Sequence, residues 1–163
     1  MVRTVKRAAL GAVVLIAGVA VLTAVSLRLF ISHEPSRWHI DPMTVDPASE
    51  ANADLITPPS APKFAVEPLQ LRSAVGEVMA LQPRTRLLAT SEDGALRTWV
   101  TTSAVMAFPD YTSILVLPVG EDPNSSTLAI YARPRFGRND FGVNRDRNSE
   151  ILRGLLERVG SVG

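Results

Sequence analysis

The sequence contains no cysteine. This absence excludes disulfides, thiolate zinc sites, thiol nucleophiles and a lipid anchor on an N-terminal cysteine. Histidine is almost as scarce, with two residues in 163, and both precede the segment in which we expect the folded core. His33, His39, Asp41 and Asp46 fit no known metal-ligand spacing. We therefore predict neither a metal nor another cofactor.

A sustained excess of basic residues is also missing. The net charge is +1, but residues 1–32 hold four cations and no acid, and the remainder carries 13 basic and 16 acidic residues. Nucleic-acid binding requires clustered lysine and arginine in excess. The chain is therefore not predicted to bind nucleic acid.

Established catalytic motifs are missing as well. There is no Gly-x-Ser-x-Gly, His-Glu-x-x-His, phosphate-binding loop or dinucleotide fingerprint. The enzymatic alternative is a hydrolase or transferase that uses Asp110 and Asp140 as an acid and base pair, with Tyr131 nearby. The sequence does not bring these residues together, so a non-catalytic protein is the favoured interpretation.

What the chain does have is a long apolar start. Residues 8–27 are uncharged and rich in alanine, valine, leucine and isoleucine, and about 20 apolar residues suffice for a helix to cross a bilayer. We predict that residues 1–32 form a basic start and an uncleaved signal-anchor, with a transmembrane helix over about 8–31. The alternative is a signal peptide cleaved after a small-residue site at 24–26.

Charges around this segment predict its orientation. Arg3, Lys6 and Arg7 precede it, and flanking cations tend to stay on the cytoplasmic side of a membrane. We therefore predict a single-pass protein of the bacterial inner membrane, with a cytoplasmic N-terminus and a periplasmic or otherwise extracytoplasmic domain.

Residues 33–63 hold six of the twelve prolines. Proline fixes φ and removes a backbone donor, so we predict an extended linker. Trp38 lies either at the headgroup level of the membrane or against the folded domain.

Residues 64–163 are predicted to fold as one α+β domain. Apolar residues recur at helical spacing over 67–82 and again towards 151–159. Between these helices, four segments have strand character, and their short connections favour antiparallel neighbours. We therefore expect helix, four-stranded antiparallel sheet, helix, with both helices on one face. The four predicted strands cover residues 86–91, 96–106, 111–119 and 127–133.

One segment, 133–147, is strongly basic. It holds five arginines and two aspartates, and guanidinium groups bind carboxylates and phosphates in bidentate geometry. We predict a site for an anionic lipid headgroup or a cell-wall carboxylate; in the structural alternative, Asp140 and Asp146 pair with neighbouring arginines. The predicted ligand-binding residues are Arg133, Arg135, Arg138 and Arg145.

Several short motifs resemble one bacterial family. They are Pro83-Arg-Thr85, Trp99-Val-Thr-Thr-Ser103, Phe108-Pro-Asp110, Ile130-Tyr-Ala-Arg-Pro-Arg-Phe-Gly137 and Asp140-Phe-Gly-Val-Asn-Arg145. Together they resemble the domain of unknown function 1499, over about residues 55–158.

This resemblance implies an uncharacterised domain that is often membrane-linked. Many relatives carry a Pro-Asn-Cys-like stretch before the first helix, where this chain has Thr57-Pro-Pro-Ser-Ala-Pro62. The function predicted from the sequence is therefore a membrane-anchored envelope module for binding or scaffolding. The resemblance implies structural signature positions at Asp110, Gly137, Asp140, Gly142 and Asn144.

Overall fold

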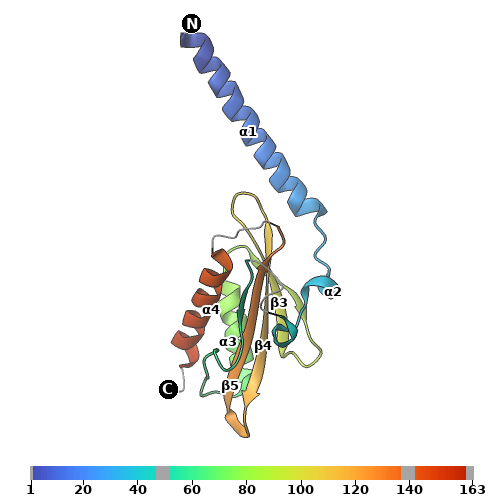
Figure 1. Cartoon of the computed structure of the whole chain (residues 1–163), viewed down its shortest axis with the longest axis vertical. Coiled ribbons are helices and arrows are strands. Elements are labelled where there is room, and N and C mark those ends of the chain that lie inside the picture. The colour runs from blue at the N-terminus through green and yellow to red at the C-terminus, as the bar shows by residue number, and fades with distance from the viewer. Residues whose placement is uncertain (1, 47–51, 137–141, 161–163) are drawn as a thin grey trace.

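The computed structural model describes residues 2–46, 52–136 and 142–160. A five-stranded antiparallel sheet forms the centre, and helices lie on both of its sides (Figure 1). In chain order the elements are α1 (Val2–Phe30), α2 (Pro35–Trp38), the 3-10 helix η1 (Pro42–Thr44), β1 (Asp54–Ile56), α3 (Pro68–Leu81), β2 (Thr85–Thr90), β3 (Leu96–Thr102), β4 (Pro109–Val119), β5 (Asp122–Pro134) and α4 (Val143–Val159).

The predicted number of four strands is wrong. The strand order is β1-β5-β4-β3-β2, and all neighbours are antiparallel. The additional strand, β1, comes from the predicted linker and pairs with β5 through Leu55 opposite Tyr131. A strand of three residues is too short to show an alternating pattern, and β5 supplies the hydrogen-bonding edge that orders it.

The first face of the sheet packs against α3 and α4. Alternate strand residues point towards these helices, and the helices contribute their own apolar stripes. Leu71 of α3 and Ile151 of α4 are completely buried in this core. The strand side chains of the core are Trp99, Ile114, Val116, Leu128 and Ile130.

The second face is covered by residues 33–45, which we call the strap. Figure 1 shows α2 on the side of the sheet opposite α3 and α4. Trp38 of the strap packs against Val100 and Tyr111. The segment is thus not an extended spacer: Pro35 and Pro42 stand at the first turns of α2 and η1, where the fixed φ of proline favours a helix.

The prediction of a transmembrane anchor over residues 8–31 is also wrong. A spanning helix must be both long and apolar, and among the described residues no helix meets both requirements for crossing a membrane. The N-terminal segment does form the helix α1, which leaves the domain near the strap (Figure 1). The location of the domain outside the cytoplasm stays a prediction.

Candidate anion-binding site

Trp38 and Tyr111 form a stacked aromatic pair on the second face. Their ring centroids lie 3.8 Å apart and the ring planes differ by 7°. Trp38 ends α2 and is only 6% exposed, while Tyr111 is 1% exposed. Large aromatic side chains gain much of their stabilisation from burial. This pair is therefore the main apolar attachment of the strap.

Hydrogen bonds hold the strap in one register on the strands. Nδ1 of His39 lies 2.8 Å from Oγ1 of Thr98, which lies 2.9 Å from Oγ of Ser113. The Ser113 hydroxyl donates to the backbone oxygen of Trp38 at 3.4 Å. Because Thr98 and Ser113 are buried, these bonds satisfy polar groups that would otherwise destabilise the second face.

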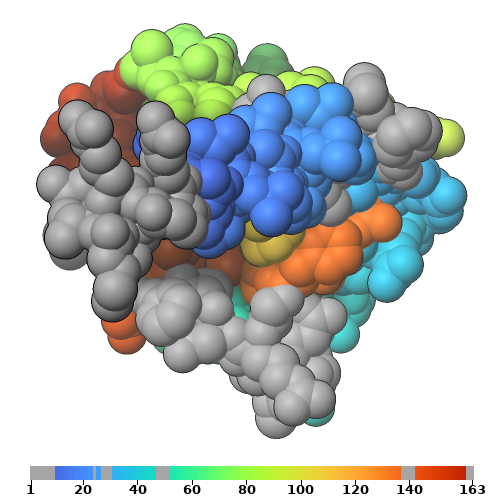
Figure 2. Space-filling view, turned by 90° about the horizontal axis from the view of Figure 1, so that it is seen from above, coloured from blue at the N-terminus to red at the C-terminus, as the bar shows by residue number. Residues whose placement is uncertain are grey.

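Three arginines surround the indole of Trp38. The guanidinium carbons of Arg37, Arg133 and Arg135 lie 5.1, 5.1 and 5.4 Å from its ring centroid. Arg133 lies at the end of β5 and Arg135 follows its last residue, Pro134, so the two arginines, two residues apart, share a face. Figure 2 shows the cyan strap against the orange end of β5. Cations within about 6 Å of an aromatic ring are attracted to its face.

A fourth arginine and a histidine complete the group. Nδ1 of His33 lies 2.8 Å from the Tyr111 hydroxyl, and Nη1 of Arg135 donates to the same hydroxyl at 3.2 Å. Burial lowers the pKa of His33, and the positive charges of Arg86 and Arg135 lower it further. Arg86 lies opposite Val100, which lies opposite Tyr111, so Arg86 stands on the same face of the sheet. We name this group the tryptophan–arginine cluster: His33, Arg37, Trp38, Arg86, Tyr111, Arg133 and Arg135.

The positive charge of the cluster is not balanced by acids. Within the described ranges, no carboxylate lies within ion-pair distance of its four arginines. Arg133 is 3% exposed; its Nη2 donates to the backbone oxygen of Arg37, and its Nε has no hydrogen-bond partner. The nearby Glu34 carboxylate accepts from the Ser32 hydroxyl at 3.2 Å. A buried charge without a counter-ion is strongly unfavourable, so the cluster is suited to an anion.

Because of its two histidines, we expect the fold to become less stable as the pH is lowered. Burial lowers the pKa of His33 and His39 below the ordinary value of 6.5. As pH falls through this value, the unfolded chain takes up protons before the folded chain does, so stability decreases. Urea unfolding at about pH 7.5 and about pH 5.5 should show the lower midpoint in acid. In His33→Gln/His39→Gln the difference should shrink, and an unchanged difference would assign it to other groups.

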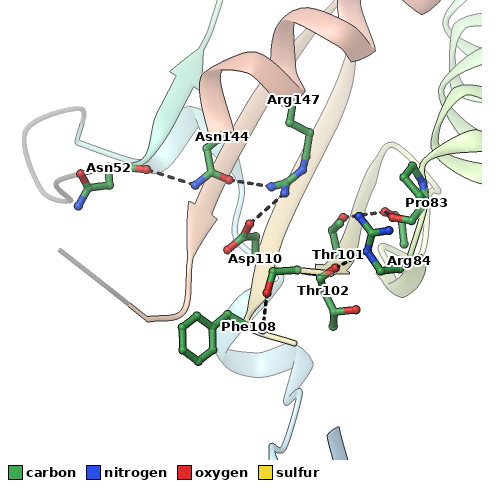
Figure 3. Close-up of polar contacts among 11 residues, drawn as sticks. Asn52, Pro83, Arg84, Thr101, Thr102, Phe108, Asp110, Asn144 and Arg147 are labelled. Atoms are coloured by element: carbon green, nitrogen blue, oxygen red, sulfur yellow. Dashed lines mark hydrogen bonds and ion pairs between the residues drawn. The ribbon is translucent and has the colours of Figure 1, made fainter. Parts of the chain in front are cut away.

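A second polar group lies at the same end of the sheet, on the side of α4. Nη2 of Arg147 bonds Oδ2 of Asp110 at 2.9 Å, and Nη1 bonds Oδ1 of Asn144 at 2.8 Å. The amide of Asn144 donates to the backbone oxygen of Asn52 at 3.3 Å. Figure 3 shows this chain of contacts joining α4, β4 and the approach to β1. We name these four residues the end network.

The motifs that suggested the family resemblance meet beside the end network. The hydroxyls of Thr85 and Thr101 lie 2.7 Å apart, and Nε of Arg84 donates to the backbone oxygen of Thr102 at 3.0 Å (Figure 3). A hollow of about 300 Å³ opens here. Its charged lining is balanced, with two arginines and two acids, and the full lining is Gln82, Pro83, Arg84, Thr101, Val143, Asp146, Arg147 and Glu150.

The structure does not place the predicted ligand-binding arginines in one site. It brings Arg133 and Arg135 together at Trp38, but Arg145 is exposed on α4, the helix on the opposite face. Arg145 lines a separate hollow of about 260 Å³ with Asn52 and Asp54. Arg138 lies outside the described residues.

The predicted signature positions have different surroundings. Asp110 and Asn144 both contact Arg147. Gly142 precedes α4 with φ of 82°, a left-handed conformation that glycine adopts without strain. Gly137 and Asp140 lie outside the described residues, and therefore so does any approach of Asp140 to Asp110.

Sequence reasoning missed Arg37, Arg86 and Tyr111 as site residues, and it left the place of Trp38 open. Arg86 and Tyr111 reach the cluster only through strand pairing: Val100 lies opposite both of them in the sheet. Pro35 is a sequence signal that could have placed Trp38. Proline favours the first turn of a helix, and a short helix that begins there can direct the tryptophan three residues later towards the domain.

Comparison with known protein families gives a match that covers most of the domain. A search of curated proteins finds no match to the chain. A family model described as "protein of unknown function (DUF1499)" matches residues 36–155. The match begins within the strap, at the second residue of α2, and includes the whole sheet, α3 and most of α4. By this match over most of its length, the chain belongs to the DUF1499 family.

Proposed function

We propose that this protein is a non-catalytic binding module whose tryptophan–arginine cluster holds a carboxylate or phosphate group of its ligand. The proposal is carried by Arg133, which is 3% exposed and has no acidic partner among the described residues. Burying an unpaired guanidinium is unfavourable, and a bound anion offsets that penalty with charge-assisted hydrogen bonds. A bound anion supplies the negative charge that no described residue places beside Arg133.

The exposed rim of the cluster provides the first contacts for such a ligand. Arg37 and Arg86 are exposed and Arg135 is half-buried, so their guanidinium groups remain accessible while Arg133 lies deeper. Planar guanidinium groups match the geometry of carboxylates and phosphates. Their combined field also accelerates the approach of anions, an effect that salt weakens.

The end network supports binding rather than catalysis. The enzymatic alternative needs Asp110 as an acid or base, but Oδ2 of this side chain is already bonded to Arg147. The side chains of both partners are at most 15% exposed, which suits a pair that fastens α4 to β4. The balanced charge of this group contrasts with the unbalanced charge at Trp38.

Two sources of the anion share this chemistry, namely a lipid headgroup phosphate and a cell-wall carboxylate. The test titrates the full chain with inorganic phosphate, glycerol phosphate and an N-acetylmuramyl peptide, using tryptophan fluorescence and calorimetry. Because Trp38 is one of only two tryptophans, binding at the cluster should change the emission. The tightest of the three probes then identifies the source.

Removing two rim arginines should weaken binding strongly. In Arg37→Gln/Arg135→Gln, we expect an affinity loss of at least about a hundredfold, since each lost hydrogen bond to a charged group costs about 1.5–3 kcal/mol. The matched control is Arg145→Gln/Arg153→Gln, which removes the same charge from two exposed positions on α4. A thermal unfolding curve checks that both variants fold.

Two results would contradict the proposal. One is equal affinity of the two double variants for the tightest probe, which would assign binding to overall charge. The other is absence of binding by the parent chain to all three probes at low salt.

A further inference from the structure

A groove lies on the helical side of the sheet, between α3 and β2. It consists of two adjoining hollows of about 260 and 520 Å³, which share Leu87 and Arg97 in their linings. Leu87 lies directly opposite Trp99, so it points to the first face. The groove thus faces α3, while the tryptophan–arginine cluster lies on the other face of the sheet; Arg86 of β2 belongs to the cluster and also contributes to the lining of the smaller hollow.

The wall formed by β2 is an open sheet edge. Among the described strands, β2 is the last in the order β1-β5-β4-β3-β2 and pairs only with β3, with a register shift between Leu87 and Ala89. An edge strand of this kind presents backbone donors and acceptors to any extended chain that approaches it. Adding a strand at such an edge is a recurring mode of peptide recognition, in which nearby pockets read alternate side chains.

The smaller hollow suits an apolar side chain. Met79, Leu87 and Trp99 contribute to its lining, and α3 presents Gly76 and Ala80 there. The absence of a side chain at Gly76 leaves room that the Arg97 guanidinium enters, at 3.1 Å from the position of a Cβ atom. Leu87 itself is 52% exposed, so its apolar surface is available to a partner.

The larger hollow suits a carboxylate. Arg72 and Arg97 both line it, and Nη2 of Arg97 donates to the backbone oxygen of Arg72. Burial lowers the pKa of Arg97, and the nearby charge of Arg72 lowers it further. Nε of Arg72 is buried without a hydrogen-bond partner. Two adjacent guanidinium groups in one hollow therefore favour an anion between them.

The acid at this hollow is already engaged. The carboxylate of Asp93 accepts from the Ser91 hydroxyl at 2.6 Å and from the Ala95 amide at 3.1 Å. It lies within ion-pair distance of neither Arg72 nor Arg97 among the described residues. Arg72 instead donates to the backbone oxygen of Asp93 at 2.8 Å. The larger hollow therefore holds two arginines and one acid in its lining, and this net positive charge favours an acidic occupant.

We propose that this groove binds an extended acidic segment of a partner protein, which adds a strand to β2. An apolar side chain of the segment enters the hollow at Met79 and Trp99, and a glutamate or aspartate lies at Arg72 and Arg97. Alternate residues of a strand share a face and lie about 7 Å apart. In the proposed complex, the two adjoining hollows take side chains that are two residues apart.

The test uses an array of eight-residue peptides probed with the full chain. The peptides vary an apolar residue at one position and place glutamate, glutamine or lysine two positions away, in a background rich in threonine and serine. We expect glutamate peptides to bind about tenfold or more tightly than glutamine peptides. In Arg97→Gln this preference should disappear. Equal binding of glutamate and lysine peptides would overturn the proposal.

A steric variant tests the location. Gly76→Leu fills the smaller hollow and requires the flexible Arg97 guanidinium, 3.1 Å from the position of a Cβ atom, to move aside, while it places a better helix former in α3. We expect at least about a tenfold loss of peptide affinity, because a leucine side chain occupies the space needed by the apolar residue. The control is Gln70→Leu, an exposed position of α3 outside both hollows, which should leave the affinity unchanged.

Hydrogen exchange of the complex tests the added strand directly. Bound peptide should slow the exchange of amides in β2, because a new strand pairs with its open edge. Protection confined to another element would contradict strand addition. If inorganic phosphate competes fully with the peptides and β2 gains no protection, the groove binds a free anion, and the peptide proposal is wrong.

Discussion

Replacing Trp38 by alanine should lower the free energy of unfolding by about 3 kcal/mol, at the lower end of the range for removing a buried aromatic side chain. The indole is 6% exposed, stacks on Tyr111 and has three guanidinium groups around it. Its removal leaves the strap without its main apolar contact. Urea unfolding followed by far-UV circular dichroism measures the change.

Trp38→Phe provides the matched control. Phenylalanine keeps an aromatic ring for Tyr111 and loses part of the contact area, so a smaller loss of about 1 kcal/mol is expected. Hydrogen exchange should show that the alanine variant opens first at the strap, since peripheral segments unfold locally before the core does. A loss below about 0.5 kcal/mol for Trp38→Ala would mean that the strap contributes little to stability.

Replacing Arg147 by methionine should destabilise the fold by about 3 kcal/mol, because it removes the guanidinium that pairs with the Asp110 carboxylate in a mostly buried place. Asn144 also loses the guanidinium that donates to its side-chain oxygen. The same experiment on Arg158→Met gives the control. Arg158 lies 3.8 Å from Glu77 in an exposed pair, and such pairs contribute about 0–1 kcal/mol.

A double-mutant cycle separates the ion pair from the other contacts. Asp110→Leu/Arg147→Met removes both charges together, so it should be more stable than the sum of the single losses predicts, by about 2 kcal/mol. Additive losses would show that Arg147 and Asp110 act independently. In that case the ion pair of the end network would not stabilise the packing of α4 against β4, as we infer that it does.

Periodicity predicts many of the helices and strands of this α+β domain. The stripe over 67–82 corresponds to α3, and the alternation at Leu128 and Ile130 gives the buried face of β5. These residues repeat at the spacing of their element, so local sequence suffices. The family resemblance was also confirmed by the match over residues 36–155.

The strap and β1 could not be derived in this way. Their order depends on tertiary contacts: β1 needs the edge of β5, and α2 needs the pocket above Tyr111. The prolines were interpreted as breakers of regular structure, although Pro35 and Pro42 begin helices. The transmembrane prediction used hydrophobicity alone and is not upheld by the described helices.

Only part of the candidate site can be predicted from the sequence, because its other residues come together through tertiary contacts. Arg133 and Arg135 stood out in a basic segment, and their common face followed from strand alternation. Arg37 and Arg86 lie about a hundred and about fifty residues earlier in the sequence, and only the folding of the strap and of β2 brings them close. Charge counting along the chain therefore grouped Arg133 with Arg145, which belongs to a different face.

The strap also changes where the chain can be shortened for laboratory work. A fragment starting at residue 64, the predicted domain boundary, would lack Trp38 and β1 and would expose Val100, Tyr111 and an edge of β5 to water. Such a fragment should self-associate at the concentrations used for crystallisation. A fragment starting at residue 31 would keep the strap over the second face and should remain monomeric.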